Sequence, residues 1–307
     1  MRGRFLSIII AVLLTSCSGC ARFAGFMTTA PPNRVLHPAL GNLCRQRAQY
    51  DSQFDVVVGP PRATLRVSML EGRPFGMRPR GTVVVLHGIF STSERMFPFA
   101  TSFAHAGYRT VFVDLRAHGN SSGLETTYGV LEARDLSQVL NDLDARGLLV
   151  QPVGVCGHSL GGSTAIQLAS RDWRVQAVVA MSAHVYMAEI VRQAVRTRIP
   201  VLKHLATDEW IAQVVHEAGK SAGFDPRMAN SLVAMQQGCT PVLLIHGTED
   251  RFVLPYHSVM LRDAAPQRTR LILLHGADHT GMLDETRDEA SQAAVSFFQE
   301  MLPVAAN

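Results

Sequence analysis

The chain has 307 residues, of which 47% are apolar and 18% are charged, so it is long and apolar enough to bury a sizeable core and is not a disordered chain. Its mean hydropathy of +0.11 is far too low for a multi-span membrane protein. The formal net charge is +4, and Lys203 and Lys220 are the two lysines among its 29 basic residues. Because the sequence contains no run of consecutive Lys or Arg, nothing in it favours a nucleic-acid partner.

The first residues have the pattern of a targeting segment. Arg2 and Arg4 precede an apolar stretch, 5–14, of about ten residues. A spanning helix needs about 20 apolar residues, so this stretch is too short to cross a membrane and fits the core of a signal peptide. The pattern predicts that residues 1–16 are a signal peptide.

The end of this segment, Leu-Thr-Ser followed by Cys17, resembles the cleavage site of bacterial lipoproteins. The resemblance implies that Cys17 becomes the first mature residue and carries acyl chains such as palmitate. Residues 17–50 would then be a lipid-anchored tether and lead-in, and the protein would be held in the cell envelope on the periplasmic or outer face. The alternative is an ordinary secretory peptide cut near Ala21 or Ala24, which would give a secreted or periplasmic protein.

Two other cysteines lie in this N-terminal region. Cys20 and Cys44 could form a disulfide in an oxidising compartment, although spacing alone does not establish the pair. No Cys and His spacing in the chain suggests a zinc site.

From residue 54 onward, strand-like and helix-like segments alternate. Two β-like segments, separated by a Pro-Pro turn, precede a continuous apolar run of the kind that forms a strand covered on both faces. The expected strands are 54–58, 64–70, 82–87, 110–114, 153–156 and 175–181, and the expected helices between them are 93–106, 131–148 and 160–170. This alternation predicts an α/β fold with a mostly parallel central sheet flanked by helices.

The alternation is interrupted between about 183 and 238. This stretch contains helix-like segments at 187–198, 207–219 and 225–237 and no clear strand, after which strands at 241–246 and 270–275 and a helix at 285–301 follow. Because ligands bind at the carboxyl ends of parallel strands, an insertion at this point predicts a helical cap above the site. The alternative is a packed elaboration that does not touch substrate. We expect one domain over 51–302, with the cap inserted in it.

A nucleophile motif follows the strand at 153–156. Gly157, Ser159 and Gly161 form the pattern Gly-x-Ser-x-Gly at the start of an apolar helix. In a nucleophile elbow the serine occupies a strained strand-to-helix turn, and the flanking glycines let neighbouring backbone pass without clashes. The strand before the motif and the helix after it favour Ser159 as a catalytic nucleophile.

A base and an acid are found after two later strands. His279 follows the strand at 270–275, and Asp250 follows the strand at 241–246. A serine hydroxyl needs a base that takes its proton, and that base needs an acid that orients it. Glu249 is the competing acid and His275 the competing base. Asp278 and Asp284 are too close to His279 in sequence to be preferred.

Four separate segments together resemble the α/β-hydrolase family over most of 54–302. They are 87–90 (His-Gly-Ile-Phe), 114–121, the serine elbow, and the pair of strand-loop segments that carry Asp250 and His279. The early segments and the helical cap also resemble esterase-, lysophospholipase- and serine aminopeptidase-like members. The resemblance implies that the backbone N–H groups of Ile89 and Leu160 form an oxyanion hole.

The expected function is a serine hydrolase that cleaves a carboxylic ester through an acyl-enzyme, with a small molecule or an acyl lipid as substrate. It would need no cofactor and no metal. The same triad also serves peptidases, thioesterases, acyltransferases and perhydrolases, so those chemistries remain alternatives. A different alternative is a non-catalytic envelope-binding lipoprotein. The sequence leaves the oligomeric state open.

Overall fold

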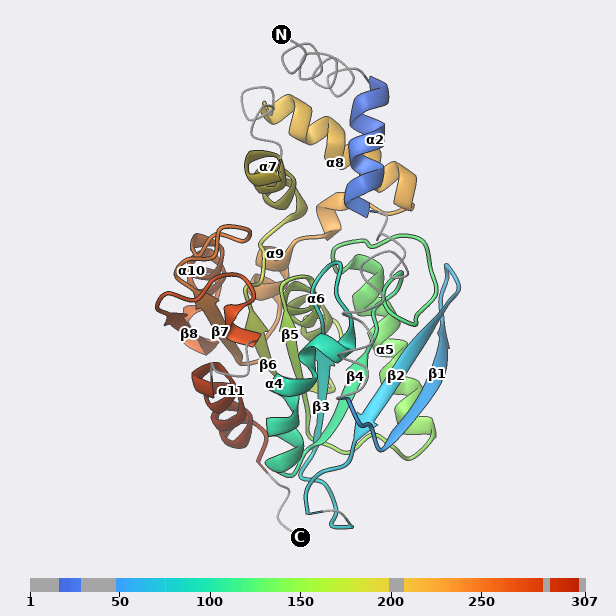
Figure 1. The fold of residues 1–307 in the computed structure, drawn as a ribbon, viewed down its shortest axis with the longest axis vertical. Helices are drawn as coiled ribbons and strands as arrows, with labels where there is room; N and C mark the ends of the chain where they lie inside the picture. Colours follow the sequence, from blue (N-terminus) through green and yellow to red (C-terminus); the bar gives the residue numbers. More distant parts are fainter. Residues whose placement is uncertain (1–16, 29–47, 75, 199–206, 284–287, 304–307) are drawn as a thin grey trace.

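The computed structural model describes residues 17–28, 48–74, 76–198, 207–283 and 288–303, and a mixed eight-stranded sheet runs through them (Figure 1). The strand order is β1-β2-β4-β3-β5-β6-β7-β8. β2 is antiparallel to β1 and β4, and the pairs from β4 to β8 are parallel. The strands are β1 (Ser52–Val58), β2 (Ala63–Leu70), β3 (Thr82–Leu86), β4 (Arg109–Val113), β5 (Val153–His158), β6 (Val175–Met181), β7 (Val242–Gly247) and β8 (Thr269–Leu274). The prediction of an α/β fold with a mostly parallel sheet is confirmed.

Helices cover both faces of the sheet. One face is covered by α4 (Ser93–His105) and α11 (Asp288–Met301), and the other by α5 (Val130–Ala145), α6 (Leu160–Ala169) and α10 (Tyr256–Ala264). Helix α10 was not expected from the sequence. Its start signal is weak, because a proline, Pro255, occupies the N-cap position without a side-chain hydrogen bond to the helix.

The uninterrupted apolar runs of the central strands follow from these two layers. On β3, Val83 and Val85 pack into the core with α4 and α11, whereas Val84 and Leu86 pack into the core with α5 and α6. Because successive side chains of a strand point to opposite faces, a strand buried on both faces must be apolar at every position. The edge strand β1 alternates exposed and buried residues over its second half instead.

The segment between β6 and β7 is helical in its described part. It contains α7 (Met187–Arg198), α8 (Asp208–Ala222), a 3-10 turn η2 (Pro226–Met228) and α9 (Ser231–Gln237). The single helix expected over 225–237 is therefore wrong. Asp225 accepts a hydrogen bond from a backbone N–H of the turn, and Asn230 accepts two from α9, so two separate caps start two separate elements.

The expected lead-in contains a helix, α2 (Cys17–Thr28), that the sequence analysis did not predict. Figure 1 shows α2 beside α8 at the end of the molecule where α7 and α8 lie. Phe23, Ala24 and Met27 are buried, and the Phe23 ring centroid lies 5.5 Å from that of Trp210 on α8. The predicted signal peptide, 1–16, and Cys44 lie outside the described residues. Among the helices that are described, none has the length and apolarity needed to span a bilayer.

Candidate active site

Ser159 occupies the turn between β5 and α6 in a strained backbone conformation, with φ 53° and ψ −115°. The flanking glycines are required by sterics. A Cβ on Gly157 would lie 2.2 Å from the carbonyl oxygen of Gly161, and a Cβ on Gly161 would lie 2.5 Å from that of Leu86. The elbow geometry predicted from the glycine spacing is therefore present in the fold.

The structure brings Ser159, His279 and Asp250 together from the carboxyl ends of three parallel strands. His279 Nε2 lies 3.1 Å from Ser159 Oγ, and His279 Nδ1 lies 2.7 Å from Asp250 Oδ2. Since an ionised carboxylate only accepts hydrogen bonds, the proton of a neutral His279 belongs on Nδ1. The lone pair of Nε2 is then directed toward the serine hydroxyl, which is the arrangement that a general base needs.

Asp250 is buried and accepts hydrogen bonds at both carboxylate oxygens. Oδ1 accepts from the backbone N–H groups of Phe252, at 2.9 Å, and Val253, at 2.8 Å. Oδ2 accepts from Nδ1 of His279 and from the hydroxyl of Ser182, at 2.8 Å. The sequence analysis did not identify Ser182, whose only signal is its place directly after a strand.

These contacts keep the Asp250 carboxylate ionised. Burial alone would raise the pKa of Asp250, but hydrogen bonds from His246 and His279 outweigh burial and hold this pKa below its ordinary value. His246 Nε2 lies 2.8 Å from the carbonyl oxygen of Val253 and 3.3 Å from Asp250 Oδ2, while its Nδ1 lies 2.6 Å from the hydroxyl of Ser258. Asp250 therefore retains the negative charge that stabilises a protonated His279.

The competing residues lie elsewhere. Glu249 and His275 are exposed at the surface, and neither has a side-chain hydrogen bond to the triad atoms within the described chain. The Asp278 carboxylate accepts the backbone N–H groups of Thr280 and Gly281, so it shapes the turn that carries His279. Asp284 lies outside the described residues.

The two expected oxyanion-hole positions lie on either side of the nucleophile. Leu160 is the first residue of α6, where backbone N–H groups have no partner inside the helix. Ile89 follows Gly88, and a Cβ on Gly88 would lie 3.3 Å from Cβ of Ser159. Within the part of the chain that the structure describes, neither the Ile89 nor the Leu160 N–H has a hydrogen-bond acceptor. Both groups are therefore available to a ligand.

Two buried histidines fix the loops around the site. His158 Nε2 donates to the carbonyl oxygen of His279 at 2.7 Å, and burial, followed by the neighbouring His279, lowers the pKa of His158 to about 3. His87 Nδ1 donates to the carbonyl oxygen of Gly88 at 2.8 Å, while its Nε2 accepts from the Leu115 N–H at 3.0 Å. Burial lowers the pKa of His87 to about 4. Both side chains are thus neutral and structural.

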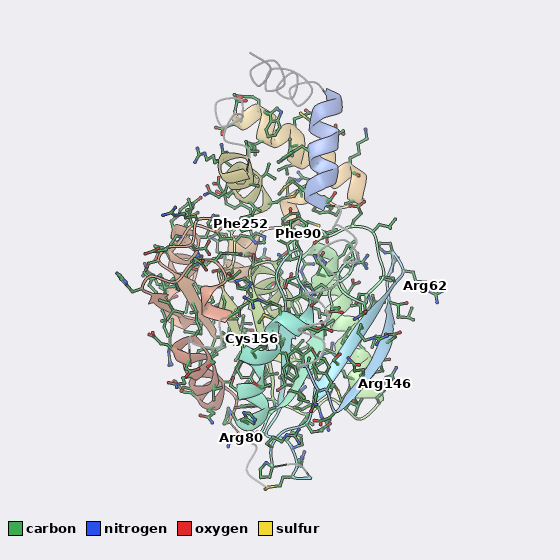
Figure 2. All side chains as sticks on the ribbon, in the orientation of Figure 1. Arg62, Arg80, Phe90, Arg146, Cys156 and Phe252 are labelled. Carbon is green, nitrogen blue, oxygen red and sulfur yellow. The ribbon has the colours of Figure 1, made fainter. Side chains whose placement is uncertain are left out.

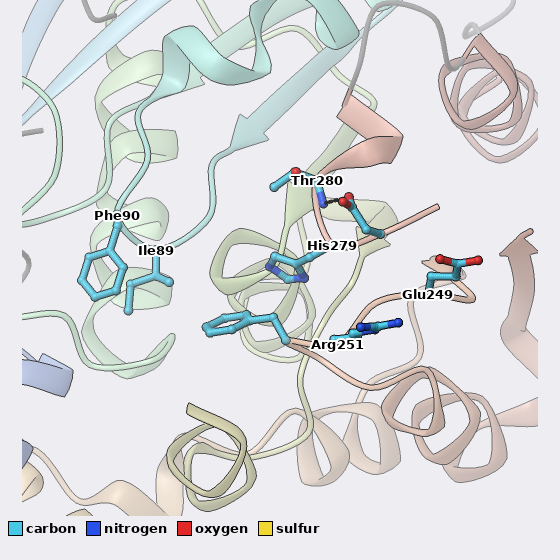
Figure 3. Close-up of a pocket in the computed structure, with 8 residues that line it drawn as sticks. Ile89, Phe90, Glu249, Arg251, His279 and Thr280 are labelled. Atoms are coloured by element: carbon cyan, nitrogen blue, oxygen red, sulfur yellow. Dashed lines mark hydrogen bonds between the residues drawn. The ribbon is translucent and has the colours of Figure 1, made fainter. Parts of the chain in front are cut away.

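A cleft of about 640 Å³ opens beside His279. Its lining residues come from the loops after β3, β7 and β8, and they are Ile89, Phe90, Glu249, Arg251, Phe252, Asp278, His279 and Thr280. Figure 3 shows Ile89 and Phe90 on one side of the cleft and His279 and Arg251 on the other. Phe90 and Phe252 lie at the end of the body nearest α7 (Figure 2). The cleft therefore gives a substrate access to the triad from this end of the sheet.

The helices between β6 and β7 border this region without lining the cleft. Gln193 on α7 donates from Nε2 to the carbonyl oxygen of Arg251 at 2.6 Å, which connects α7 to the loop that carries Asp250. None of the described residues of α7, α8 and α9 is among those that line the cleft. Met187, Ile190 and Val191 of α7 are buried in the core.

Comparisons with known proteins agree with this fold. The sequence family described as Serine aminopeptidase, S33 matches residues 77–223, a stretch just under half of the chain that includes Ser159 and ends before Asp250 and His279. Esterase YjfP of Escherichia coli is 25% identical over 253 residues, covering 77% of this chain and 96% of its own. A monoacylglycerol lipase of Mycolicibacterium smegmatis is 26% identical over 253 residues, covering 71% of this chain and 85% of its own.

Among solved structures, an esterase of Pyrococcus furiosus superposes with a TM-score of 0.67 at 22% identity, covering 89% of this chain and 98% of its own. That likeness concerns the fold, which agrees with the strand order and the elbow described above. On the fold and these similarities together, the chain is an α/β-hydrolase enzyme.

Proposed function

We propose that the protein is a serine hydrolase that cleaves carboxylic esters through an acyl-enzyme intermediate. Ser159 is the nucleophile, His279 the general base and acid, and Asp250 the residue that orients His279. The observation that carries the proposal is the continuous hydrogen-bonded chain from Ser159 Oγ through His279 to Asp250, at a serine held with φ 53°. The similarity to the E. coli esterase and the M. smegmatis lipase supports an ester as the substrate.

In the first half of the reaction, Ser159 Oγ attacks the carbonyl carbon of the ester while His279 Nε2 takes the hydroxyl proton. The carbonyl oxygen becomes negatively charged, and the N–H groups of Ile89 and Leu160 stabilise that charge. His279 then gives its proton to the leaving alcohol as the carbon–oxygen bond breaks. Loss of one such N–H donor typically costs about 10²- to 10³-fold in rate.

In the second half, water enters the cleft and His279 Nε2 takes one of its protons. The resulting hydroxide attacks the acyl carbonyl, and the same two N–H groups again stabilise the negative oxygen. His279 returns the proton to Ser159 Oγ as the acid is released. These steps need no cofactor, because protons move only between Ser159, His279, the leaving alcohol and water.

The test is covalent labelling with a fluorophosphonate probe, with the adduct located by mass spectrometry. We expect the adduct on Ser159 and none in a folded His279→Ala variant, because the serine needs the base for reactivity. Ser159→Ala should abolish ester turnover and leave the unfolding midpoint near that of the wild type. A folded wild type that takes up no label would contradict the proposal and favour the non-catalytic envelope protein.

The fold also supports amide chemistry, and the match to the serine aminopeptidase family makes a peptidase the second candidate. A panel of p-nitrophenyl esters of increasing acyl length beside aminoacyl-p-nitroanilides separates the two. We expect kcat/KM to favour the esters at every acyl length. The similarity to a monoacylglycerol lipase makes an acyl lipid the substrate that we would test next.

We also propose that the mature protein begins at Cys17 and is held in the cell envelope by acyl chains on this residue. Cleavage near Ala21 or Ala24 would cut through α2 and remove Cys20, which is buried. The packing of α2 on α8 supports the lipoprotein site over the ordinary secretory site, because cleavage before Cys17 leaves α2 whole. The mass of the N-terminal peptide from membranes tests this: an acylated Cys17 is expected, and an unmodified N-terminus at residue 22 or 25 would contradict it.

A further inference from the structure

The residues at the end of β6 connect the nucleophile to the acid. β6 lies between β5, which leads to Ser159, and β7, which leads to Asp250. The Ser159 N–H donates to the carbonyl oxygen of Met181 at 2.8 Å, and the Ser182 N–H donates to that of Ile245 at 2.9 Å. The sheet ladder therefore continues past β6 on both sides, and Ser182 stands between the two catalytic loops.

The Ser182 hydroxyl is fully buried and has a specific acceptor. Its Oγ donates to Asp250 Oδ2 at 2.8 Å, and the same oxygen accepts the His279 Nδ1–H at 2.7 Å. Ser182 also has φ 46°, a left-handed conformation that residues with a Cβ rarely adopt because it is strained. A strained residue whose side chain ends on the catalytic carboxylate points to a role in the site.

We propose that Ser182 is a positioning residue for the acid of the triad, an inference that rests on the proposed hydrolase function. Two backbone N–H groups hold Oδ1 of Asp250, and the Ser182 hydroxyl holds Oδ2, so the carboxylate plane cannot rotate away from His279. The hydroxyl also takes up part of the negative charge of Oδ2, which sets how strongly Asp250 stabilises the protonated base.

Two variants separate the effect of the Ser182 hydroxyl from the effect of the strained backbone at this residue. Ser182→Ala and Ser182→Gly both remove the hydroxyl, but only glycine relieves the strain at φ 46°. The matched control is Ser231→Ala, since Ser231 is equally buried and its hydroxyl has no partner among the described residues. If the alanine variant fails to fold, the glycine variant still reports on the hydroxyl.

We expect both variants to lower kcat on a p-nitrophenyl ester by about 3- to 30-fold, with KM within about twofold, because a hydrogen bond to a charged group is lost while substrate contacts remain. Loss of the donor strengthens the charge that Oδ2 presents to His279. The acidic limb of the kcat/KM profile should then move up by about 0.3–0.5 pH unit. The other titratable groups around this pair are His158, packed on His279, His246, against Asp250, and two buried histidines whose charges interact with the pair, His184 with His279 and His257 with Asp250. None of them is changed.

The outcomes are distinguishable. Equal kcat and an unshifted acidic limb in folded Ser182→Gly would overturn the positioning role while the hydrolase proposal stands. A similar change in Ser231→Ala would also overturn it, because any buried serine would then have the same effect. A wild type that neither labels with fluorophosphonate nor turns over ester would overturn the proposed function and this inference with it.

Discussion

The catalytic end of the sheet and the helix pair α2 and α8 are held in place by different kinds of contact. Around the triad, backbone groups set the positions: the Ser159 N–H donates to Met181 O, and two N–H groups hold Asp250 Oδ1. Where α2 meets α8, buried side chains such as Phe23 and Met27 form the contact. Backbone geometry restricts which residue types can occupy a position, whereas apolar packing accepts many. The first region can therefore be recognised in a sequence far more readily than the second.

The largest effect is expected at the catalytic end of the sheet, where the carboxylate of Asp250 can be replaced by an amide. Asp250→Asn should lower kcat by about 10³- to 10⁴-fold without unfolding the protein, because an amide can donate to Nδ1 of His279 and so favour the wrong tautomer. The matched control is Asp144→Asn, the same change at an exposed carboxylate of α5 that does not line the cleft, and its kcat on the same p-nitrophenyl ester should stay within about twofold. Glu249→Gln tests the competing acid, and we expect it to keep far more activity than Asp250→Asn.

If Asp250→Asn kept the wild-type kcat and Glu249→Gln lost it, the loop after β7 would have to rearrange when substrate binds. The hydrogen bonds from Phe252 and Val253 to Asp250 oppose such a change, because it would leave both N–H groups without their acceptor. The pair of variants therefore tests whether the geometry of the free protein is the working geometry.

The positions of Asp250 and His279 were predictable because each follows a recognisable strand, and that of Ser159 because glycines flank it at fixed spacing. Ser182 was not, since a serine after a strand is common and its partner Asp250 lies 68 residues away. The same limit applies to α2, whose Phe23 packs on the distant Trp210. The interruption of the helix expected at 225–237 shows a second limit, because caps at Asp225 and Asn230 override apolar periodicity.

The contribution of the α2–α8 contact to stability can be tested by removing one aromatic side chain. Phe23→Ala should lower the free energy of unfolding by about 3 kcal/mol, because a buried aromatic ring is lost between α2 and α8. Trp173→Ala is the matched control: its ring is 84% exposed, so the change should stay within about 0.5 kcal/mol. Urea unfolding of the mature protein measures both. An unaffected Phe23→Ala variant would mean that the mature protein lacks a docked α2, as cleavage near Ala24 would require.

His184 lies in the segment that connects β6 to α7. We expect the free energy of unfolding to depend on pH through this residue. His184 is buried, and burial, followed by the charges of His257 and His279, lowers its pKa to about 3. A histidine in the unfolded chain titrates near pH 6.5. Between about pH 6.5 and pH 3, His184 is protonated in the unfolded chain but neutral in the folded chain. The free energy of unfolding therefore falls as the pH falls through this range.

Protonation of His184 in the unfolded chain lowers the free energy of unfolding by up to about 1.4 kcal/mol for each pH unit of acidification. His184→Gln should therefore flatten the decline in unfolding free energy between about pH 6 and pH 4 by that amount, with urea midpoints measured at each pH. The exposed His216→Gln should keep the wild-type slope. Equal slopes in all three proteins would mean that the segment that connects β6 to α7 opens in mild acid and hydrates His184. In that case the hydrogen bond from Gln193 on α7 to Arg251 would break at a higher pH than that at which the sheet unfolds.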